Sequence, residues 1–454
     1  MKIVLVGCGK IGKAIIASLV NEKHDVVAID TNPKVVEDVR NTYDIIAYCG
    51  NGTNYLDLKD ADVERAELFI AVTGSDELNM LACFCAKRMG AKHTVARIRD
   101  IENNHENLSF MKEQLELSMV INPERMTAEA IYNLIKTPSA TKVERFLNGP
   151  LEMIEVFLKD NSPMCGKTLI EVRKDCKIKF LISTVYRDGE IYIPNGNFIL
   201  QGGDKIGIVA SKKDTYKLLQ LMGLSNIQLK NVMILGAGTI SGYLSNILLA
   251  DRHNVKVVEI DKQACDDICE QLDGNATVIN GDGMSQDLLI EEGINSTDAF
   301  ISLTGSDENN ILISVYAQSK EVPKVITKVN RDELSVIAEN IGLTTTITPK
   351  RIVADVIVKY ARALENTIGS QIESLYSVMN GMAEVLEFKV LDDFDYLNVP
   401  IKDMCLSNGV LIAGISRKNH AIIPSGDDVI LSGDSVVVIA EGKRVMSLFD
   451  IIKR

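Results

Sequence analysis

The chain opens with Met1-Lys2-Ile3-Val4-Leu5-Val6-Gly7-Cys8-Gly9-Lys10-Ile11-Gly12. The run from Lys2 to Val6 is short, apolar and rich in β-branched residues, which is typical of a strand buried on both faces. Three glycines follow with the spacing G-x-G-x-x-G, and residues 13–20 carry apolar side chains at helical spacing. Strand, glycine turn and helix in this order indicate the βαβ unit that binds dinucleotides.

The three glycines of this loop have different expected roles. Gly7 permits the tight turn after the strand, Gly9 lets backbone N–H groups approach a phosphate, and Gly12 lets helix and strand pack closely. A helix N-terminus offers unpaired N–H groups and the positive end of the helix dipole, and both favour an anion. We therefore predict that the pyrophosphate of a bound nucleotide lies at the start of this helix.

A second strand, Asp25–Asp30, ends in a carboxylate eighteen positions after Gly12. An acidic side chain at this place accepts hydrogen bonds from a ribose diol and repels a 2′-phosphate. The pattern favours NAD(H) or adenine nucleotides over NADP(H). The alternative is a Rossmann-type domain that keeps the glycine loop only for packing.

The whole unit occurs twice in the chain. Residues 231–242 repeat the opening stretch at an offset of 229 (236 − 7), and the same offset places Glu259 where the first copy has Asp30. Further along, residues 72–79 recur as residues 303–310 at an offset of 231 (304 − 73). A repeat of this length indicates a duplication, which has to be recognised before any single motif is interpreted.

The second copy departs from the first within the glycine loop. Ser241 stands where the first copy has Gly12. A small residue still allows close packing of helix and strand, but the two predicted nucleotide sites need not have equal affinity or preference.

Composition narrows the class of protein. A net charge of −13 and a pI near 5.1 argue against a nucleic-acid partner and against a polybasic membrane anchor. We expect no transmembrane helix, because no run of about eighteen uncharged apolar residues occurs. We also expect no signal peptide, because the first predicted strand begins at Lys2. The nine cysteines are scattered and odd in number, which fits a reducing cytosol.

The pattern of elements predicts two kinds of domain. Strands and helices alternate at first, which predicts an α/β fold, a doubly wound parallel sheet with helices on both faces. Later stretches are rich in short strands with Gly- and Asn-containing turns, which predicts a small α+β domain. The expected order is a Rossmann-like nucleotide-binding domain at 1–120, a linking helix at 121–140, a small α+β domain at 141–225, a second Rossmann-like domain at 229–348, a linking helix at 349–371 and a second small α+β domain at 372–454.

Ligands of doubly wound sheets bind outside the carboxyl ends of the strands, near the point where the strand order reverses. Besides the glycine loop and Asp30, the residues expected there are Asn51, Thr73, Gly74 and Arg97. The hydroxyl of Thr73 and nearby N–H groups could contact ribose or phosphate. The stretch Thr-Gly-Ser-Asp before a helix is also good capping chemistry, and the two roles are compatible.

The glycine loop with Asp30, the Gly-Asp-Gly stretch at 281–283, the two Thr-Gly-Ser-Asp motifs and the repeated small domain together resemble a known family over essentially the whole chain. The chain resembles the TrkA family, the peripheral regulatory subunits of Trk potassium uptake systems, whose tandem units are similar to RCK (regulator of K⁺ conductance), or KTN, domains. The resemblance implies that NAD/NADH, or ATP and ADP, bind the Rossmann halves. It also implies a homo-oligomer on the cytoplasmic face of the cell membrane that gates a membrane-embedded, Trk-type potassium-translocating subunit.

The resemblance also implies a set of cofactor-binding residues in each half. In the first half these are Gly7, Cys8, Gly9, Lys10, Ile11, Gly12, Asp30, Asn51, Thr73, Gly74 and Arg97. In the second half they are Gly236, Ala237, Gly238, Thr239, Ile240, Glu259, Asp282, Thr304, Gly305 and Lys328. Relatives often carry a phosphate-contacting arginine at the position of Lys10, which could equally be a solvated surface lysine. Duplication makes a dimer or a tetramer the expected assembly, and the preferred nucleotide of each half stays open.

The rival class is an enzyme, an NAD-dependent dehydrogenase of unknown substrate. Such an enzyme needs an acid–base residue and a substrate clamp beside the nicotinamide. The five histidines are candidates only in turns, loops or before strands, and the cysteines lack partners for a zinc site. We therefore predict a nucleotide-binding protein without catalytic residues and without a bound metal.

Overall fold

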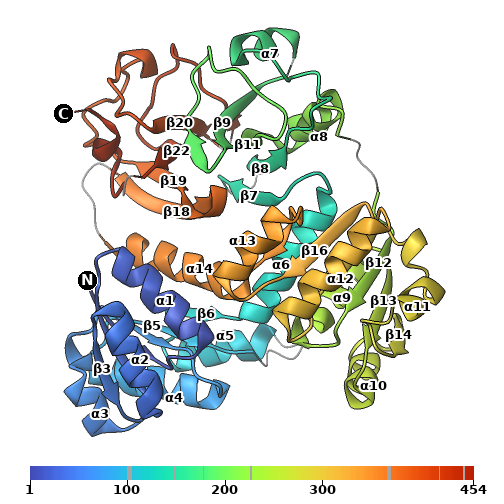
Figure 1. The fold of residues 1–454 in the computed structure, drawn as a ribbon. Coiled ribbons are helices and arrows are strands. Elements are labelled where there is room, and N and C mark those ends of the chain that lie inside the picture. Colours follow the sequence, from blue (N-terminus) through green and yellow to red (C-terminus); the bar gives the residue numbers. More distant parts are fainter. Residues whose placement is uncertain are drawn as a thin grey trace. The chain divides into compact units, whose positions relative to one another are not determined.

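The structure, a computed structural model, describes residues 1–99, 105–147, 150–176, 178–224, 228–365, 370–418, 420–442 and 445–453. The chain forms two compact units. One contains residues 1–128 and 348–361, and the other contains residues 129–347 and 362–454. The units are described separately below, and Figure 1 shows the elements of each.

The first unit is built on a six-stranded parallel sheet with the strand order β3-β2-β1-β4-β5-β6. Its strands are β1 (Lys2–Val6), β2 (Asp25–Asp30), β3 (Ile46–Cys49), β4 (Leu68–Ala71), β5 (His93–Arg97) and β6 (Met119–Ile121). The order reverses between β2-β1 and β1-β4, so the crevice for a ligand lies above the carboxyl end of β1. The predicted doubly wound sheet is confirmed.

Helices connect these strands. They are α1 (Lys10–Asn21), α2 (Pro33–Tyr43), α3 (Tyr55–Asp60), the 3₁₀ helix η1 (Val63–Arg65), α4 (Asp76–Met89) and α5 (His105–Gln114). Helix α6 (Pro123–Lys136) follows β6, and its residues from 129 on belong to the second unit. The sequence analysis did not predict α5 or β6, because the apolar residues of α5 are few and β6 is only three residues long. His105, expected in a loop, begins α5.

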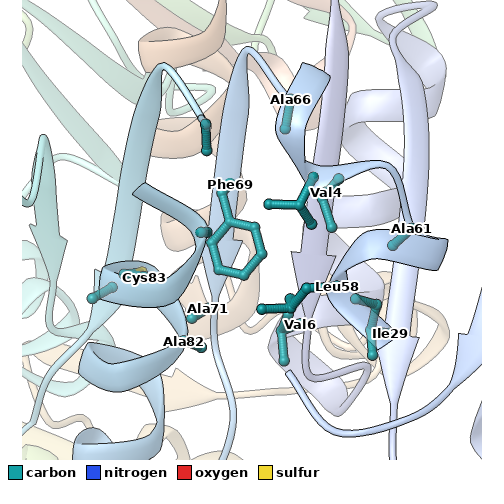
Figure 2. Close-up of a cluster of buried hydrophobic side chains, with 14 of the residues drawn as sticks. Val4, Val6, Ile29, Leu58, Ala61, Ala66, Phe69, Ala71, Ala82 and Cys83 are labelled. Atoms are coloured by element: carbon teal, nitrogen blue, oxygen red, sulfur yellow. The ribbon is translucent and has the colours of Figure 1, made fainter. Parts of the chain in front are cut away.

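The core beneath the first sheet explains the apolar strand pattern. Figure 2 shows Phe69 of β4 at the centre of a buried cluster, with Val4 and Val6 of β1 beside it and Leu58 and Cys83 from the covering helices. All five side chains are fully or almost fully buried. Burying a side chain of this size contributes roughly 1.5–3 kcal/mol relative to exposure, which holds the strand ends that form the crevice.

The second Rossmann-like sheet repeats the first, with the parallel order β14-β13-β12-β15-β16-β17. Its strands are β12 (Asn231–Leu235), β13 (Asn254–Glu259), β14 (Thr277–Asn280), β15 (Ala299–Ser302), β16 (Lys324–Lys328) and β17 (Thr346–Ile347). Its helices are α9 (Thr239–Ala250), α10 (Lys262–Gln271), α11 (Gln286–Glu291), η2 (Ile294–Ser296), α12 (Asp307–Ser319) and α13 (Asp332–Asn340), followed by α14 (Pro349–Leu364). The duplicated fold read from the sequence is therefore present in both halves.

Each small domain is an antiparallel sheet, in the order β10-β9-β11-β8-β7 for the first and β21-β20-β22-β19-β18 for the second. The first has β7 (Lys142–Phe146), β8 (Leu151–Phe157), α7 (Leu169–Asp175), β9 (Phe180–Arg187), β10 (Glu190–Tyr192), β11 (Lys205–Ser211) and α8 (Lys212–Leu221). The second has β18 (Ser370–Val378), η3 (Met379–Gly381), β19 (Ala383–Val390), η4 (Ile401–Asp403), β20 (Val410–Arg417), β21 (His420–Ile422), β22 (Ser435–Glu441) and η5 (Leu448–Ile451). The predicted α+β class is confirmed, although β7 and α7 were not predicted.

The two small domains share one hydrophobic core within the second unit. Phe146, Leu151 and Val209 of the first domain lie in the same buried cluster as Val385 and Val437 of the second. Each domain therefore covers an apolar face that its partner would otherwise leave exposed.

Two buried carboxylates join the small domains reciprocally. The backbone N–H of Met379 donates to Glu155 at 2.7 Å, and the N–H of Leu147 donates to Glu387 at 3.2 Å. Both pairs are related by an offset of 232 residues (387 − 155 and 379 − 147). Leu147 and Met379 both adopt a positive φ, at +57° and +49°, which turns their N–H groups toward the opposite domain. The same hydrogen bond therefore occurs twice, once from each small domain to the other.

No helix among the described residues is long and apolar enough to cross a membrane.

Candidate functional site

The glycine loop of the first half has the close packing that a Rossmann turn requires. Gly7 has a φ of +95°, and a Cβ atom there would lie 2.8 Å from the backbone nitrogen of Thr73. A Cβ atom on Gly12 would overlap the carbonyl oxygen of Gly7. Gly9 and Gly74 differ from these, because a Cβ atom on either would meet no described atom within 4 Å. Both of these glycines border open space at the carboxyl edge of the sheet.

Asp30 at the end of β2 is fixed by the loop beside it. One carboxylate oxygen accepts the N–H of Cys8 at 2.7 Å, and the other accepts the N–H of Asn32 at 2.9 Å. An ionised carboxylate has about four acceptor positions, so two remain for ribose hydroxyls. The N–H of Cys8 points at Asp30 rather than into the crevice, which leaves the N–H groups of Gly9, Lys10 and Ile11 for a phosphate.

The thiol of Cys8 is buried beneath the loop. Burial first, and then the negative charge of Asp30, raise its pKa to about 12, so the thiol stays protonated at neutral pH. A neutral, buried thiol is a poor nucleophile. Cys8 therefore contributes shape and a backbone N–H group to the site and no thiolate chemistry.

A buried asparagine, which the sequence analysis missed, organises the loop after β4. The Oδ1 atom of Asn79 accepts both the N–H and the hydroxyl of Thr73, at 2.8 and 2.7 Å, and its Nδ2 atom donates to the carbonyl of Arg97 at 2.9 Å. The cap of α4 is Ser75, whose hydroxyl accepts the N–H of Leu78. The capping role expected of this stretch thus belongs to Ser75, while the hydroxyl of Thr73 is directed at Asn79.

The remaining predicted residues of the first half also lie at the carboxyl ends of strands. Arg97 ends β5 and forms an ion pair with Glu124, with 2.6 Å between the charged groups. The Nε atom of Arg97 is buried and has no hydrogen-bond partner among the described residues. Asn51 follows β3, where its side-chain oxygen accepts the N–H of Thr53 at 3.0 Å.

The second half repeats the hydrogen bond between the glycine loop and the acidic side chain at the end of the second strand. Glu259 ends β13 and accepts the N–H of Ala237 at 2.8 Å and that of Asp261 at 2.9 Å. Gly236 has a φ of +104°, as the turn requires. Ser241, in place of the third glycine, donates its hydroxyl to the carbonyl of Gly236 at 2.5 Å. Where the first loop has Gly12 packed against the carbonyl of Gly7, the second loop therefore has a hydrogen bond between Ser241 and Gly236.

The loop after β15 is also repeated. Asn310 accepts the N–H and hydroxyl of Thr304, at 2.9 and 2.7 Å, and donates to the carbonyl of Lys328 at 3.1 Å. The ammonium group of Lys328 in turn donates to the carbonyl of Leu303 at 2.9 Å. The remaining predicted residues of this half lie between strands and the helices that follow, or at a helix start: Gly238 precedes α9, Thr239 and Ile240 begin it, Asp282 lies after β14, and Gly305 lies between β15 and α12. The predicted residues of each half therefore lie at the carboxyl ends of strands or in the loops and helix starts that follow those ends.

The histidines lie elsewhere. His24 and His253 directly precede β2 and β13, and His93 begins β5, so these three stand at the amino ends of strands, opposite the crevice. His420 belongs to a small domain, and the side chain of His105 is outside the described residues. Across the described part of the chain no cluster of three or more His, Cys, Asp or Glu side chains could hold a metal ion.

The chain matches two domain families along most of its length. The TrkA-N domain matches residues 3–123 and 232–349, and the TrkA-C domain matches residues 153–223 and 385–453. The Trk system potassium uptake protein TrkA homolog of Archaeoglobus fulgidus is 31% identical over 454 residues, which is 100% of each chain. The Trk system potassium uptake protein TrkA of Halomonas elongata is 28% identical over 98% of this chain and 96% of its own.

Solved structures share the fold at low sequence identity. The GsuK RCK domain has a TM-score of 0.62 at 16% identity, covering 97% of this chain and 92% of its own. The GsuK channel bound to NAD has a TM-score of 0.63 at 17% identity, covering 97% of this chain and 77% of its own. With two TrkA-N and two TrkA-C domains in alternation, and TrkA relatives along its full length, this chain belongs to the TrkA family of Trk system potassium uptake proteins.

Proposed function

We propose that this protein is a nucleotide-sensing regulatory subunit that gates a membrane-embedded, Trk-type potassium-translocating subunit. NAD(H), ATP or ADP binds the carboxyl edge of each Rossmann-like sheet. The proposal rests on a hydrogen bond that occurs in both halves. The acidic side chain at the end of the second strand accepts a backbone N–H of the glycine loop: Asp30 accepts that of Cys8, and Glu259 accepts that of Ala237. Each carboxylate stands beside open space above a glycine loop and keeps acceptor positions for a ribose diol.

Names of relatives support the ligand and the partner. Full-length relatives are named Trk system potassium uptake proteins. Channel structures with the same fold are described as GsuK bound to NAD and GsuK bound to ADP. A protein of this kind acts from the cytoplasmic face of the membrane, as a peripheral subunit of the transporter.

The proposed role requires no covalent reaction of the nucleotide. Each described imidazole stands at the amino ends of strands or in a small domain, away from where a nicotinamide would lie. Nucleotide binding can do work by shifting a conformational equilibrium, to the extent that affinity differs between the two conformations. An NAD-dependent dehydrogenase would need an acid–base group at the crevice.

Exposed apolar residues at repeated positions support self-association. One position on the helix after the fourth strand and two on the helix after the fifth strand are exposed and apolar in both copies. They are Leu81, Phe110 and Met111 in the first half and Leu312, Val336 and Ile337 in the second. Phe110 is 63% exposed and Val336 is 59% exposed. Exposed apolar groups at equivalent places of a duplicated chain fit contacts between copies, as a dimer or tetramer would make.

The test is potassium uptake at low external potassium in cells that lack the gene. The cells are complemented with the wild type, with the double variant Asp30→Ala and Glu259→Ala, or with a control. The control is Glu37→Ala with Asp266→Ala, which removes two exposed carboxylates at repeat-equivalent places on α2 and α10.

We expect uptake to be lost on deletion, restored by the wild type and the control, and poorly restored by the site variant. Equal restoration by the site variant and the control would show that nucleotide binding does not regulate uptake. Uptake that is indifferent to the gene would remove the transport role and favour the search for an enzymatic substrate.

A further inference from the structure

We propose that the two nucleotide sites select ligands of different charge. The first half takes an adenine nucleotide with terminal phosphate groups, such as ATP. The second half takes a dinucleotide such as NADH, in which both phosphates are bridging and the total negative charge is smaller. This inference rests on the proposed function, because it assigns ligands to the sites described there.

The first difference lies in the glycine loops. Lys10 is the first residue of α1, is exposed and forms no ion pair with a described residue, so its ammonium group is available to a phosphate. The same position in α9 is Thr239, which carries no charge. The second lysine of α1, Lys13, is already paired with Asp38, so Lys10 supplies the uncommitted positive charge at this helix start.

The second difference lies in the turn after the third strand. In the first half, the side-chain oxygen of Asn51 accepts the N–H of Thr53 at 3.0 Å. In the second half, Asp282 makes the equivalent contact with the N–H of Met284 at 2.9 Å. An amide oxygen and a carboxylate oxygen serve this turn equally well. The first half has a carboxylate elsewhere in this turn, because Asp57 accepts the N–H of Asn51 at 2.7 Å, and Leu288 stands at the place of Asp57 in the second half. The turn therefore holds one carboxylate in each half, at different positions.

The same replacement occurs after the second strand. Asn32 caps α2 by accepting the N–H of Lys34 at 3.0 Å, and Asp261 caps α10 by accepting the N–H of Ala264 at 2.9 Å. Asn and Asp are comparable caps, so here too the local structure is kept while a negative charge is added. The added charge of Asp261 lies two residues after the ribose acid Glu259, and the N–H of Asp261 donates to that carboxylate at 2.9 Å.

These replacements change the charge that a phosphate group meets. The first site combines two cations with three carboxylates and carries a net charge of −1: Lys10, Arg97, Asp30, Asp57 and Glu124. The second site combines one cation with three carboxylates and carries a net charge of −2: Lys328, Glu259, Asp261 and Asp282. Near a protein surface, one unit charge at about 8 Å changes the affinity for a singly charged group on the order of tenfold. The more anionic ligand loses more at the second site.

The second site offers an apolar contact in return. Ile260 follows the ribose acid Glu259 directly and is 67% exposed, whereas the first half has the polar Thr31 at this place. An exposed aliphatic side chain beside the ribose acid suits the face of an adenine ring. Binding at the second site can therefore depend on adenosine contacts more than on phosphate charge.

The test uses the full chain with one site closed at a time. Gly7→Val closes the first site and Gly236→Val closes the second, because both glycines have positive φ and face the backbone of the loop after the fourth strand. Each variant is titrated with ATP and with NADH by calorimetry in magnesium-free buffer. A stoichiometry of one nucleotide per chain shows that the open site has kept its fold.

We expect the ratio of the Kd for ATP to the Kd for NADH to be at least about tenfold lower at the first site than at the second. Thr239→Lys with Asp282→Asn, in the chain with the first site closed, should improve ATP affinity by about 10- to 100-fold and change NADH affinity much less. Lys10→Thr with Asn51→Asp, in the chain with the second site closed, should do the reverse. The asparagine and aspartate exchanges keep the turn contacts and so serve as matched substitutions.

Equal ratios at the two sites, or charge exchanges that leave the ratios unchanged, would overturn the inference and leave the proposed function standing. Binding of neither nucleotide at either open site would refute the proposed function, and this inference with it.

Discussion

Glu155→Gln should loosen the contact between the two small domains. Glu155 is 2% exposed at its side chain and forms an ion pair with Lys205, itself 9% exposed, with 2.8 Å between the charged groups. Its other oxygen accepts the N–H of Met379 at 2.7 Å. A glutamine has one acceptor oxygen and one amino group, so one of these two donors would face another donor in either orientation.

The size of the effect follows from the buried charge. Removing one partner of a buried ion pair costs about 3–5 kcal/mol, since the remaining charge loses its compensation. A donor left unsatisfied costs about 1–3 kcal/mol, and the two costs overlap because the glutamine oxygen can satisfy one of the donors. We therefore expect Glu155→Gln to destabilise the small-domain pair by about 4 kcal/mol.

The pH dependence has a definite sign. Burial alone would raise the pKa of Glu155, but the ammonium groups of Lys205 and Lys142 and the hydrogen bond from Met379 hold that pKa below its usual value. A carboxylate whose pKa is lowered on folding contributes stability above its unfolded pKa and loses it as the pH falls through the folded value. Wild-type protein should lose this contribution in acid, whereas Glu155→Gln should have lost it already at neutral pH.

The measurement is hydrogen exchange, because a chain with several domains does not unfold in one step. Peptides covering β8 and β11 should exchange faster in Glu155→Gln, and the thermal transition of this part should fall by at least roughly 5 °C. Glu387→Gln is the matched control: its amide oxygen can still accept the N–H of Leu147, and Ser435 stands where the first domain has Lys205. We expect it to cost about 1 kcal/mol.

Two results would refute this reasoning. One is exchange in Glu155→Gln that matches the wild type. The other is an equal effect of Glu155→Gln and Glu387→Gln, which would mean that the lysine pair contributes nothing. Glu155→Gln combined with Lys205→Met should regain most of the loss, because the unpaired buried charge is then gone.

Three further substitutions test the proposed sites. Asp30→Ala should weaken NADH binding to the first half about 10- to 100-fold in calorimetry, since ribose hydroxyls lose a charged acceptor, while Asp30→Asn should recover part of the loss. Gly236→Val should reduce the stoichiometry from two nucleotides to one, because its Cβ atom would lie 3.1 Å from the backbone of Leu303 at a φ of +104°; a stoichiometry of two would misplace the site. Asn79→Ala should lower nucleotide affinity and speed exchange of the Thr73 amide, whose acceptor it removes; unchanged exchange would contradict its role.

The parallel sheets were predictable because their physics is local. A strand buried on both faces reads as an unbroken apolar run, and the strand predicted at Asp25–Asp30 is the observed β2. Once the doubly wound fold is recognised, the observed strand order is the usual one for that fold, and each βαβ connection is expected to be right-handed. Repetition of the pattern in the second half then fixed the architecture.

The missed elements depend on tertiary contacts. The β7 segment, Lys142–Phe146, is mostly charged and is too short to stand out, yet its Phe146 is fully buried in the core that the two small domains share. That core is assembled from residues more than two hundred positions apart. Periodicity within a short window cannot report such a partner.

The site residues, too, include some that the sequence predicts and some that it does not. Asp30 and the glycines were predictable, because their roles follow from the backbone geometry of a strand-to-helix turn. Asn79 and Asn310 were not singled out, although both end the repeated eight-residue stretch, at 72–79 and 303–310. The sequence did offer one indication of their role, because both copies of the repeated stretch end in asparagine. A buried asparagine that holds two donors of one threonine gives that identity a physical reason.

Fusing two copies into one chain has a consequence for the nucleotide sites. Identical chains that pair symmetrically must present identical sites, since every residue occurs in both. A duplicated chain keeps the symmetric contact, as the reciprocal bonds of Glu155 and Glu387 demonstrate, while each site is free to change. The replacement of Asn32 by Asp261 alters charge while the helix cap is kept. One chain can then respond to two nucleotides that separate identical subunits could not distinguish.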